Sequence, residues 1–124
     1  MAQTRQRSAP TATTNYDFKT QAVQYYTSNA TTNFTVNIRG NSTTSLNTVM
    51  AIGQTATMVL MVTNGATPYY PNVIQIDGTT ITPKYQGGIT ITAGNASSVD
   101  IYTITIVKTA ANTYISFVSQ TKFA

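Results

Sequence analysis

The chain has 124 residues, which is enough for one domain and too few for two independent cores. Seven Lys and Arg against three Asp and Glu give a net charge of +4, and the sequence contains no His, Cys or Trp. The absence of His and Cys excludes a Ser-His-Asp triad, disulfide bonds and the usual zinc sites.

Charged residues make up only 8% of the sequence, against about a quarter in an ordinary globular protein. Such a chain is either a poorly soluble monomer or a subunit whose surface is covered in an assembly, and we favour the assembly. The basic residues are scattered, so nucleic-acid binding is not expected. The longest apolar run, Met58 to Val62, is too short to cross a bilayer, so no membrane partner is expected either.

Residues 1–14 form a polar, basic segment that contains Pro10 and has no hydrophobic period. This composition predicts a flexible arm, because the segment buries too little to offset its chain entropy. Arg5 and Arg7 are its candidate contacts to a neighbouring subunit, and the alternative is a terminus without a role. On this interpretation residues 15–124 form the folded domain, and deleting residues 2–14 leaves that domain intact.

The first strands are predicted over Gln21–Thr27 and Phe34–Arg39. In the second of these, Phe34, Val36 and Ile38 alternate with polar residues, which places the three apolar side chains on one face. Turn-forming residues follow both segments.

One short helix is predicted over Ser45–Gly53. Ser45 is placed to cap its first turn, and Gly53 is placed to end it at the C′ position. A helix of at most two turns needs tertiary contacts to form.

The remaining strands are predicted over Thr55–Thr63, Val73–Ile76, Thr79–Thr82, Asp100–Lys108 and Thr113–Gln120. The pair Asp77-Gly78 is a strong signal for a tight hairpin turn. Short strands at regular spacing predict an all-β fold, namely a single antiparallel β-sandwich or a small barrel with an extended N-terminal arm and at most one short helix.

Catalytic chemistry finds little support in the sequence. The only carboxylates are Asp17, Asp77 and Asp100. Turn geometry accounts for Asp77, and capping at the start of a strand accounts for Asp100. No nucleotide-binding motif or calcium loop is present, so we expect no enzyme activity, no cofactor and no metal.

Tyrosines are the one enriched residue type with binding potential. Two adjacent pairs occur at Tyr25-Tyr26 and Tyr69-Tyr70, and Tyr85 lies in a Gly-rich loop. An exposed Tyr suits protein interfaces and the stacking of sugars, whereas a buried one completes a core that lacks Trp. Tyr69, Tyr70 and Tyr85 are therefore the candidate contacts to an interface or a receptor.

A set of motifs in the second half of the chain resembles a module of virion structural proteins from tailed bacteriophages, especially marine phages that infect cyanobacteria. The resemblance rests on TPYYPN at residues 67–72, IDGT at 76–79, TPKYQGG at 82–88, GNASSVDIYT at 94–103 and SQTKFA at 119–124. It covers roughly residues 33 to 124. In those proteins the module often closes a long tail-fibre-like chain.

The resemblance implies a structural protein on the surface of a virion. Only about 32 residues precede the module here, without a fibre shaft, so we expect a capsid decoration or cement protein, or a short fibre or collar subunit. Its implied partners are other virion proteins and further copies of itself, with a trimer as the expected oligomer. The alternative is a receptor- or glycan-binding module at the tip of a tail fibre.

Overall fold

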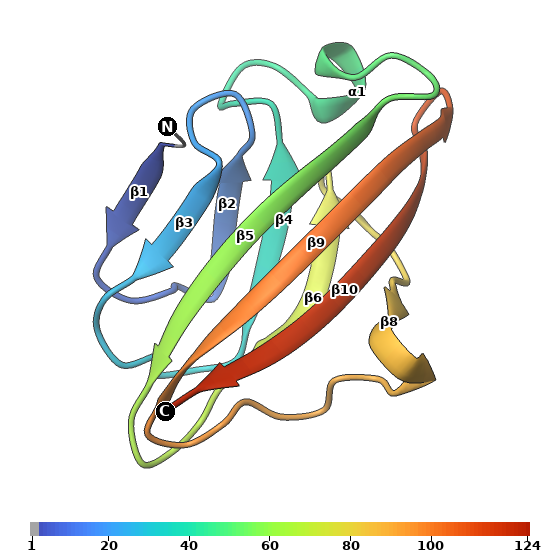
Figure 1. Cartoon of the computed structure of the whole chain (residues 1–124). Coiled ribbons are helices and arrows are strands. Elements are labelled where there is room, and N and C mark those ends of the chain that lie inside the picture. The colour runs from blue at the N-terminus through green and yellow to red at the C-terminus, as the bar shows by residue number, and fades with distance from the viewer. Residues whose placement is uncertain (1–2) are drawn as a thin grey trace.

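Two β-sheets packed face to face make up residues 3–124, which are the residues that the computed structural model describes (Figure 1). The six-stranded sheet has the order β1-β3-β5-β9-β10-β8, and the four-stranded sheet has the order β2-β4-β6-β7. The all-β sandwich predicted from the sequence is thus confirmed. The strands are β1 (Thr4–Arg7), β2 (Thr13–Asp17), β3 (Val23–Tyr26), β4 (Phe34–Arg39), β5 (Thr55–Asn64), β6 (Pro71–Ile76), β7 (Thr79–Thr80), β8 (Lys84–Tyr85), β9 (Ser98–Ala110) and β10 (Thr113–Phe123).

The first six strands alternate between the two sheets along the chain. As a result β1, β3 and β5 run parallel in one sheet, and β2, β4 and β6 run parallel in the other. Only β5-β9, β9-β10 and β6-β7 pair in antiparallel fashion. The prediction of an antiparallel sandwich was therefore wrong in this detail, because most connections cross between sheets instead of folding back as hairpins.

Residues 4–7 and 13–17 lie within the sheets, so over residues 3–14 the structure does not have the flexible arm that was expected for residues 1–14. Residues 1 and 2 of that expected arm lie outside the described residues. This polar segment has no hydrophobic period, and backbone hydrogen bonds to β3 hold it in place instead. The carbonyl oxygen of Gln3 accepts from the amide of Val23 at 3.1 Å, and that of Arg7 accepts from the amide of Thr27 at 2.9 Å. The expected domain boundary at residue 14 falls inside β2, where Thr14 is buried.

The predicted helix exists but is shorter than expected. It spans α1 (Leu46–Val49), and Ser45 caps it by accepting a hydrogen bond from the amide of Thr48 at 3.1 Å. Its C-cap is Met50, which has an extended backbone, so Gly53 is not its C′ residue. Gly53 has a φ of 89° and belongs to the turn that leads into β5. A single 3₁₀ turn, η1 (Gln86–Gly88), follows β8.

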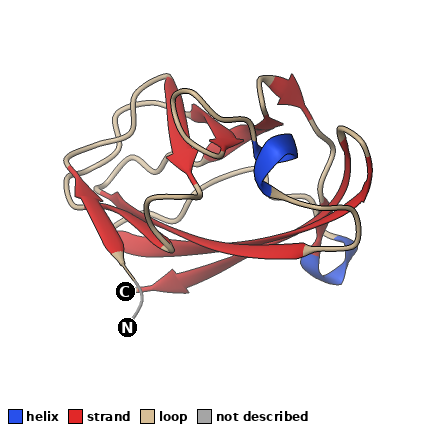
Figure 2. Ribbon diagram, turned by 90° about the horizontal axis from the view of Figure 1, so that it is seen from above, coloured by secondary structure: helices blue, strands red, loops and turns tan. Residues whose placement is uncertain are grey.

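The core lies between the two sheets, and α1 lies at one end of the sandwich (Figures 1 and 2). Alternating residues of the strands supply it, as predicted for Phe34–Arg39, and the same alternation is present in β9. The tilted rings of Tyr26 and Phe34, 6.3 Å apart, lie within it. The predicted tight turn is present, with positive φ angles at Asp77 and Gly78. The largest fully buried side chains include Tyr16, Tyr26, Tyr102, Phe34, Ile38, Leu46, Met58, Leu60, Ile104 and Ile106.

Candidate assembly surface

The outer face of the six-stranded sheet, hereafter the outer face, is the most distinctive surface of the molecule. Successive strand residues point to opposite sides, so the residues that alternate with the buried ones form this face. Threonines and apolar side chains share it. The apolar members are Val23, Tyr25, Val59, Met61, Val99, Ile101, Val107, Ile115, Phe117 and Phe123.

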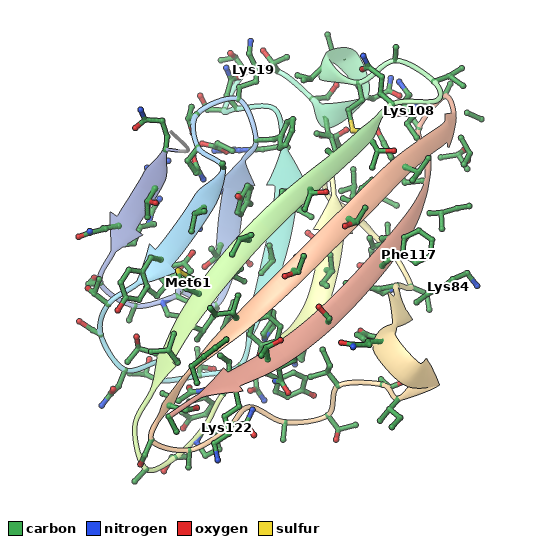
Figure 3. The ribbon with its side chains drawn as sticks, viewed as in Figure 1. Lys19, Met61, Lys84, Lys108, Phe117 and Lys122 are labelled. Carbon is green, nitrogen blue, oxygen red and sulfur yellow. The ribbon has the colours of Figure 1, made fainter. Side chains whose placement is uncertain are left out.

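Strand register aligns these side chains in rows across the sheet. One row joins Thr57, Thr105 and Phe117. Ile115, Phe117 and Phe123 are 40%, 45% and 54% exposed, which makes them three of the five exposed large hydrophobic residues among residues 3–124. In Figure 3, Met61 and Phe117 mark the two sides of this face. Large apolar side chains exposed on one flat face are typical of an interaction surface.

Charge is almost absent from the outer face. Among the residues that the structure describes, Lys84 on the edge strand β8 is the one charged residue on it, opposite Phe117 in the register. Asp100 and Lys108 on β9 belong to the buried side of the sheet. Most of the net positive charge of the chain is therefore carried elsewhere on the molecule.

The exposed side of the four-stranded sheet has the opposite character. Across β2 and β4, the side-chain amide of Asn37 donates to that of Asn15 at 3.0 Å. In the next row the guanidinium of Arg39 donates to the carboxylate of Asp17 at 2.6 Å. These polar pairs are suited to contact with water, which leaves the outer face as the candidate assembly surface.

The predicted tyrosine contacts do not lie on the outer face. Tyr69, Tyr70 and Tyr85 are half-buried and pack against the hydrophobic core. Burial raises the pKa of the Tyr85 hydroxyl, and the nearby Tyr70 adds to the rise. The backbone amide of Tyr69 donates to the side chain of Asn64 at 3.0 Å, and that of Tyr70 donates to Asn33 at 3.1 Å.

Arg5 and Arg7 point from β1 toward the gap between the sheets. Their register partners on β3, Gln24 and Tyr26, are buried, so all four side chains share the inner side of the sheet. At the edge of the sandwich formed by β1 and β2, a groove brings both arginines together with Arg39, which comes from the exposed side of the four-stranded sheet. The structure thus groups the two predicted arm residues with a third arginine that sequence reasoning missed.

Each of the three carboxylates has a structural partner. Asp17 pairs with Arg39, and Asp77 accepts hydrogen bonds from the backbone amides at the start of α1. The buried Asp100 accepts from both the backbone and side-chain amides of Asn95 at 2.8 Å, which fixes the loop before β9. Within residues 3–124, no group of three or more His, Cys, Asp or Glu is placed to hold a metal ion.

No helix in the described part of the chain is long and apolar enough to span a membrane.

The outer face was not recognised from the sequence, although a signal for it exists. In Thr113–Gln120, Ile115 and Phe117 alternate with Tyr114, Ser116 and Val118, so apolar residues occur in both phases of the strand. A strand with apolar side chains on both sides either is buried on both sides within the protein or has one side that binds a partner. The second phase of this strand is the signal that predicts an interface.

Comparison with protein-family models, with curated proteins and with solved structures yields no match for this chain.

Proposed function

We propose that this protein is a structural subunit of a bacteriophage virion, exposed on the particle surface, and that it works by assembly. The resemblance of its motifs to a phage tail-fibre-like module supports the virion setting, as a capsid decoration or cement protein or as a short fibre or collar subunit. The outer face, which is nearly free of charge and has Phe117 at 45% exposure, is the observation that carries the assembly part of this proposal.

A second copy of this chain is the occupant that we propose for the outer face. A face whose one charged residue, Lys84, lies on its edge strand repels its own copy only weakly, even though each chain carries a net charge of +4. A strongly charged partner surface would bind the outer face poorly, because its charges would lose their hydration without gaining ion pairs. The face is therefore matched best by another surface with little charge, and we propose that a second copy of the chain supplies this surface.

The size of the outer face is sufficient for a specific contact. At about 4.8 Å between strands and about 3.3 Å per residue, six strands with long central members present roughly 700 Å². Each partner in a stable interface buries about 600–1,000 Å². Burying apolar area at about 25 cal/mol per Å² over many copies then stabilises the particle.

Two symmetric arrangements cover Phe117. In a twofold dimer two outer faces stack about 10 Å apart, as the layers of a β-sandwich do. In the trimer implied by the resemblance, the outer face of each subunit packs against the flank of the next. Either arrangement removes the exposed aromatic and branched side chains from water.

The substitution Phe117→Lys tests this proposal. We expect the purified wild-type protein to form a defined oligomer in sedimentation velocity, and we expect Phe117→Lys to shift it to monomer. Circular dichroism should stay unchanged, because the side chain of Phe117 makes no part of the core. The matched control is Asn72→Lys, which adds the same charge at an exposed position of the other sheet and should leave the oligomer intact.

Two results would contradict self-assembly through this face. One is a wild-type chain that stays monomeric over the whole accessible concentration range. The other is a Phe117→Lys variant that associates as strongly as the wild type. Association should also persist when salt is raised from about 0.1 M to about 1 M, because screening weakens contacts between charges and not apolar ones.

The rival function, a receptor- or glycan-binding tip module, relies on Tyr69, Tyr70 and Tyr85. Packing of these side chains against the core leaves less of their surface for a sugar. We also propose no catalytic role, because Asp17, Asp77 and Asp100 each serve a structural contact.

A further inference from the structure

A groove that holds three arginines lies between the first strands of the two sheets. It has a volume of about 300 Å³, and Arg5, Arg7, Arg39, Asp17, Asn15 and Thr13 contribute to its walls. Both Arg5 and Arg7 come from β1, two residues apart on the same side of the strand. A cavity of this size is at the lower end of the range that holds small ligands or a few side chains.

Positive charge in the groove exceeds negative charge. Asp17 is its one acidic residue: it accepts from Nε of Arg39 at 2.6 Å and lies 3.7 Å from a terminal nitrogen of Arg5. Among the ion pairs of the described residues, none involves Arg7. Three guanidinium groups against one carboxylate leave an excess of two positive charges, and Asp17 orients two of these groups in advance.

The strand that carries Arg5 and Arg7 has a free edge. β1 is the terminal strand of the six-stranded sheet and pairs only with β3. The backbone bonds toward β3 involve Gln3 and Arg7, so those of the alternate residues Thr4 and Gln6 face away from the sheet. An extended peptide can add to such an edge through its own amide groups.

We propose that β1 and the arginine groove together bind an extended acidic segment of a partner protein. The segment adds a strand beside β1, and its alternate Asp or Glu side chains enter the groove. Side chains two residues apart on a strand are about 6.8 Å apart, which is the spacing shared by Arg5, Arg7 and the carboxylates of a neighbouring strand. The planar guanidinium group matches a carboxylate through two parallel hydrogen bonds.

This inference deepens the proposed function and rests on it for one point, that the partner is another virion protein. The groove itself is separate from the outer face, because β1 directs Arg5 and Arg7 to the inner side of the sheet. Self-association and acidic-peptide binding are therefore independent properties of the same subunit.

A short capped peptide of alternating Glu and Thr is the probe for this site, with the Gln-Thr peptide of equal length as its control. Calorimetry should show that the Gln-Thr peptide binds at least about tenfold more weakly, because the ion pairs are lost. Amide hydrogen exchange measured by NMR should slow at Thr4 and Gln6 when the Glu-Thr peptide binds. Protection at these two amides is the signature of strand addition, which an ion pair alone does not produce.

Arg7→Gln should weaken binding of the Glu-Thr peptide by about five- to tenfold. Arg7 is exposed, so this variant keeps the fold. The matched control is Lys84→Gln, which removes the same charge from β8 at the opposite edge of the sheet (Figure 3) and should bind like the wild type.

Three results would overturn the proposal. The first is equal binding of the two peptides. The second is binding of the Glu-Thr peptide that behaves as a simple ion pair, in that Thr4 and Gln6 gain no protection and free glutarate binds equally tightly. The third is an oligothymidylate of matched length that binds more tightly and displaces the peptide. The Phe117→Lys monomer should still bind the Glu-Thr peptide, so failure of this site and failure of self-assembly are seen separately.

Discussion

The ammonium group of Lys108 lies 2.7 Å from the backbone carbonyl oxygen of Met50, at the end of α1. It donates a second hydrogen bond to the carbonyl oxygen of Asn47, also at 2.7 Å. Lys108 is only 5% exposed, and its charge is matched by the oxygen atoms at the C-terminal end of a short helix instead of by a carboxylate. A basic residue of β9 thus fixes the segment that precedes β5.

Replacing Lys108 with Met should lower the free energy of unfolding by about 2 kcal/mol, because one buried and one partly buried carbonyl group lose their donor while the apolar stem is retained. Urea denaturation followed by circular dichroism measures this change. The control Lys122→Met, at an exposed position of β10, should stay within about 0.5 kcal/mol of the wild type. Equal losses in the two variants would show that the buried contact has no special role.

Asp77 stabilises α1 from the tight turn between β6 and β7. Its carboxylate accepts from the backbone amides of Leu46 at 2.7 Å and of Asn47 at 3.0 Å. Asp77→Ala should cost about 2 kcal/mol, because both bonds are lost and the residue has a φ of 50°. Asp77→Asn should cost about half as much, since Asn tolerates this backbone and keeps one acceptor. Thermal melts of the two variants compare them directly, and a larger loss for Asn than for Ala would contradict this assignment.

Stability should fall at alkaline pH because of Tyr16. Its hydroxyl is buried and donates to the carbonyl oxygen of Ala22, and burial raises its pKa from 10.0 to about 12. In the unfolded chain the phenol ionises near its ordinary pKa, so this contribution is complete below about pH 10 and is lost as the pH rises toward 12. The loss amounts to about 2–3 kcal/mol for Tyr16.

Denaturant titrations at pH 8 to 12 measure this dependence of the free energy of unfolding on pH. A shift of one pKa unit corresponds to about 1.4 kcal/mol. Tyr16→Phe should be slightly less stable near neutral pH but should lose less stability in the alkaline range. Part of the decline should remain in that variant, because burial also raises the pKa of Tyr102. If the Tyr16→Phe variant loses as much unfolding free energy between about pH 10 and 12 as the wild type, groups other than Tyr16 cause the decline.

Truncation at the N-terminus separates the roles of β1 and β2. Deleting residues 2–8 removes β1 and leaves β3 as the edge of its sheet, and we expect a folded protein with a modest loss of thermal stability. Deleting residues 2–14 also removes the buried Pro10 and Thr14, and we expect a loss of several kcal/mol or failure to fold. Equal stability of the two truncated chains would contradict this expectation and would support the prediction from composition that residues 1–14 form a flexible arm.

Much of the fold follows from local patterns. Alternation placed Phe34, Val36 and Ile38 in the core, and the pair Asp77-Gly78 identified a hairpin. The parallel pairings were not predictable, because nothing in a single strand records which sheet its successor joins. β1 was missed for a related reason: its four exposed residues are held by backbone hydrogen bonds, which leave no hydrophobic period.

The candidate site was predicted only in part. Arg5 and Arg7 were noted for their proximity in sequence, but the third arginine of the groove, Arg39, lies 32 positions beyond Arg7 and reaches them only through the pairing of β2 with β4. The outer face was hidden by the same alternation that defines the core. Alternation shows that successive residues of a strand point to opposite faces of the sheet. When both faces contain Ile, Val and Phe, however, it does not show which face stays exposed.

The crossing connections between the sheets also set the order in which the protein can form during synthesis on the ribosome. β5 joins β3 to β9, so its ladder stays half complete until residues 98–110 have been made. Until then β5, which carries the core residues Met58, Leu60 and Val62, has no β9 strand paired beside it. The nascent chain can associate with other unfolded chains during this period. Because the β9-β10 hairpin lies at the C-terminal end of the chain, it completes the sheet last, and slowing translation before it would prolong the period in which these apolar side chains are unpaired.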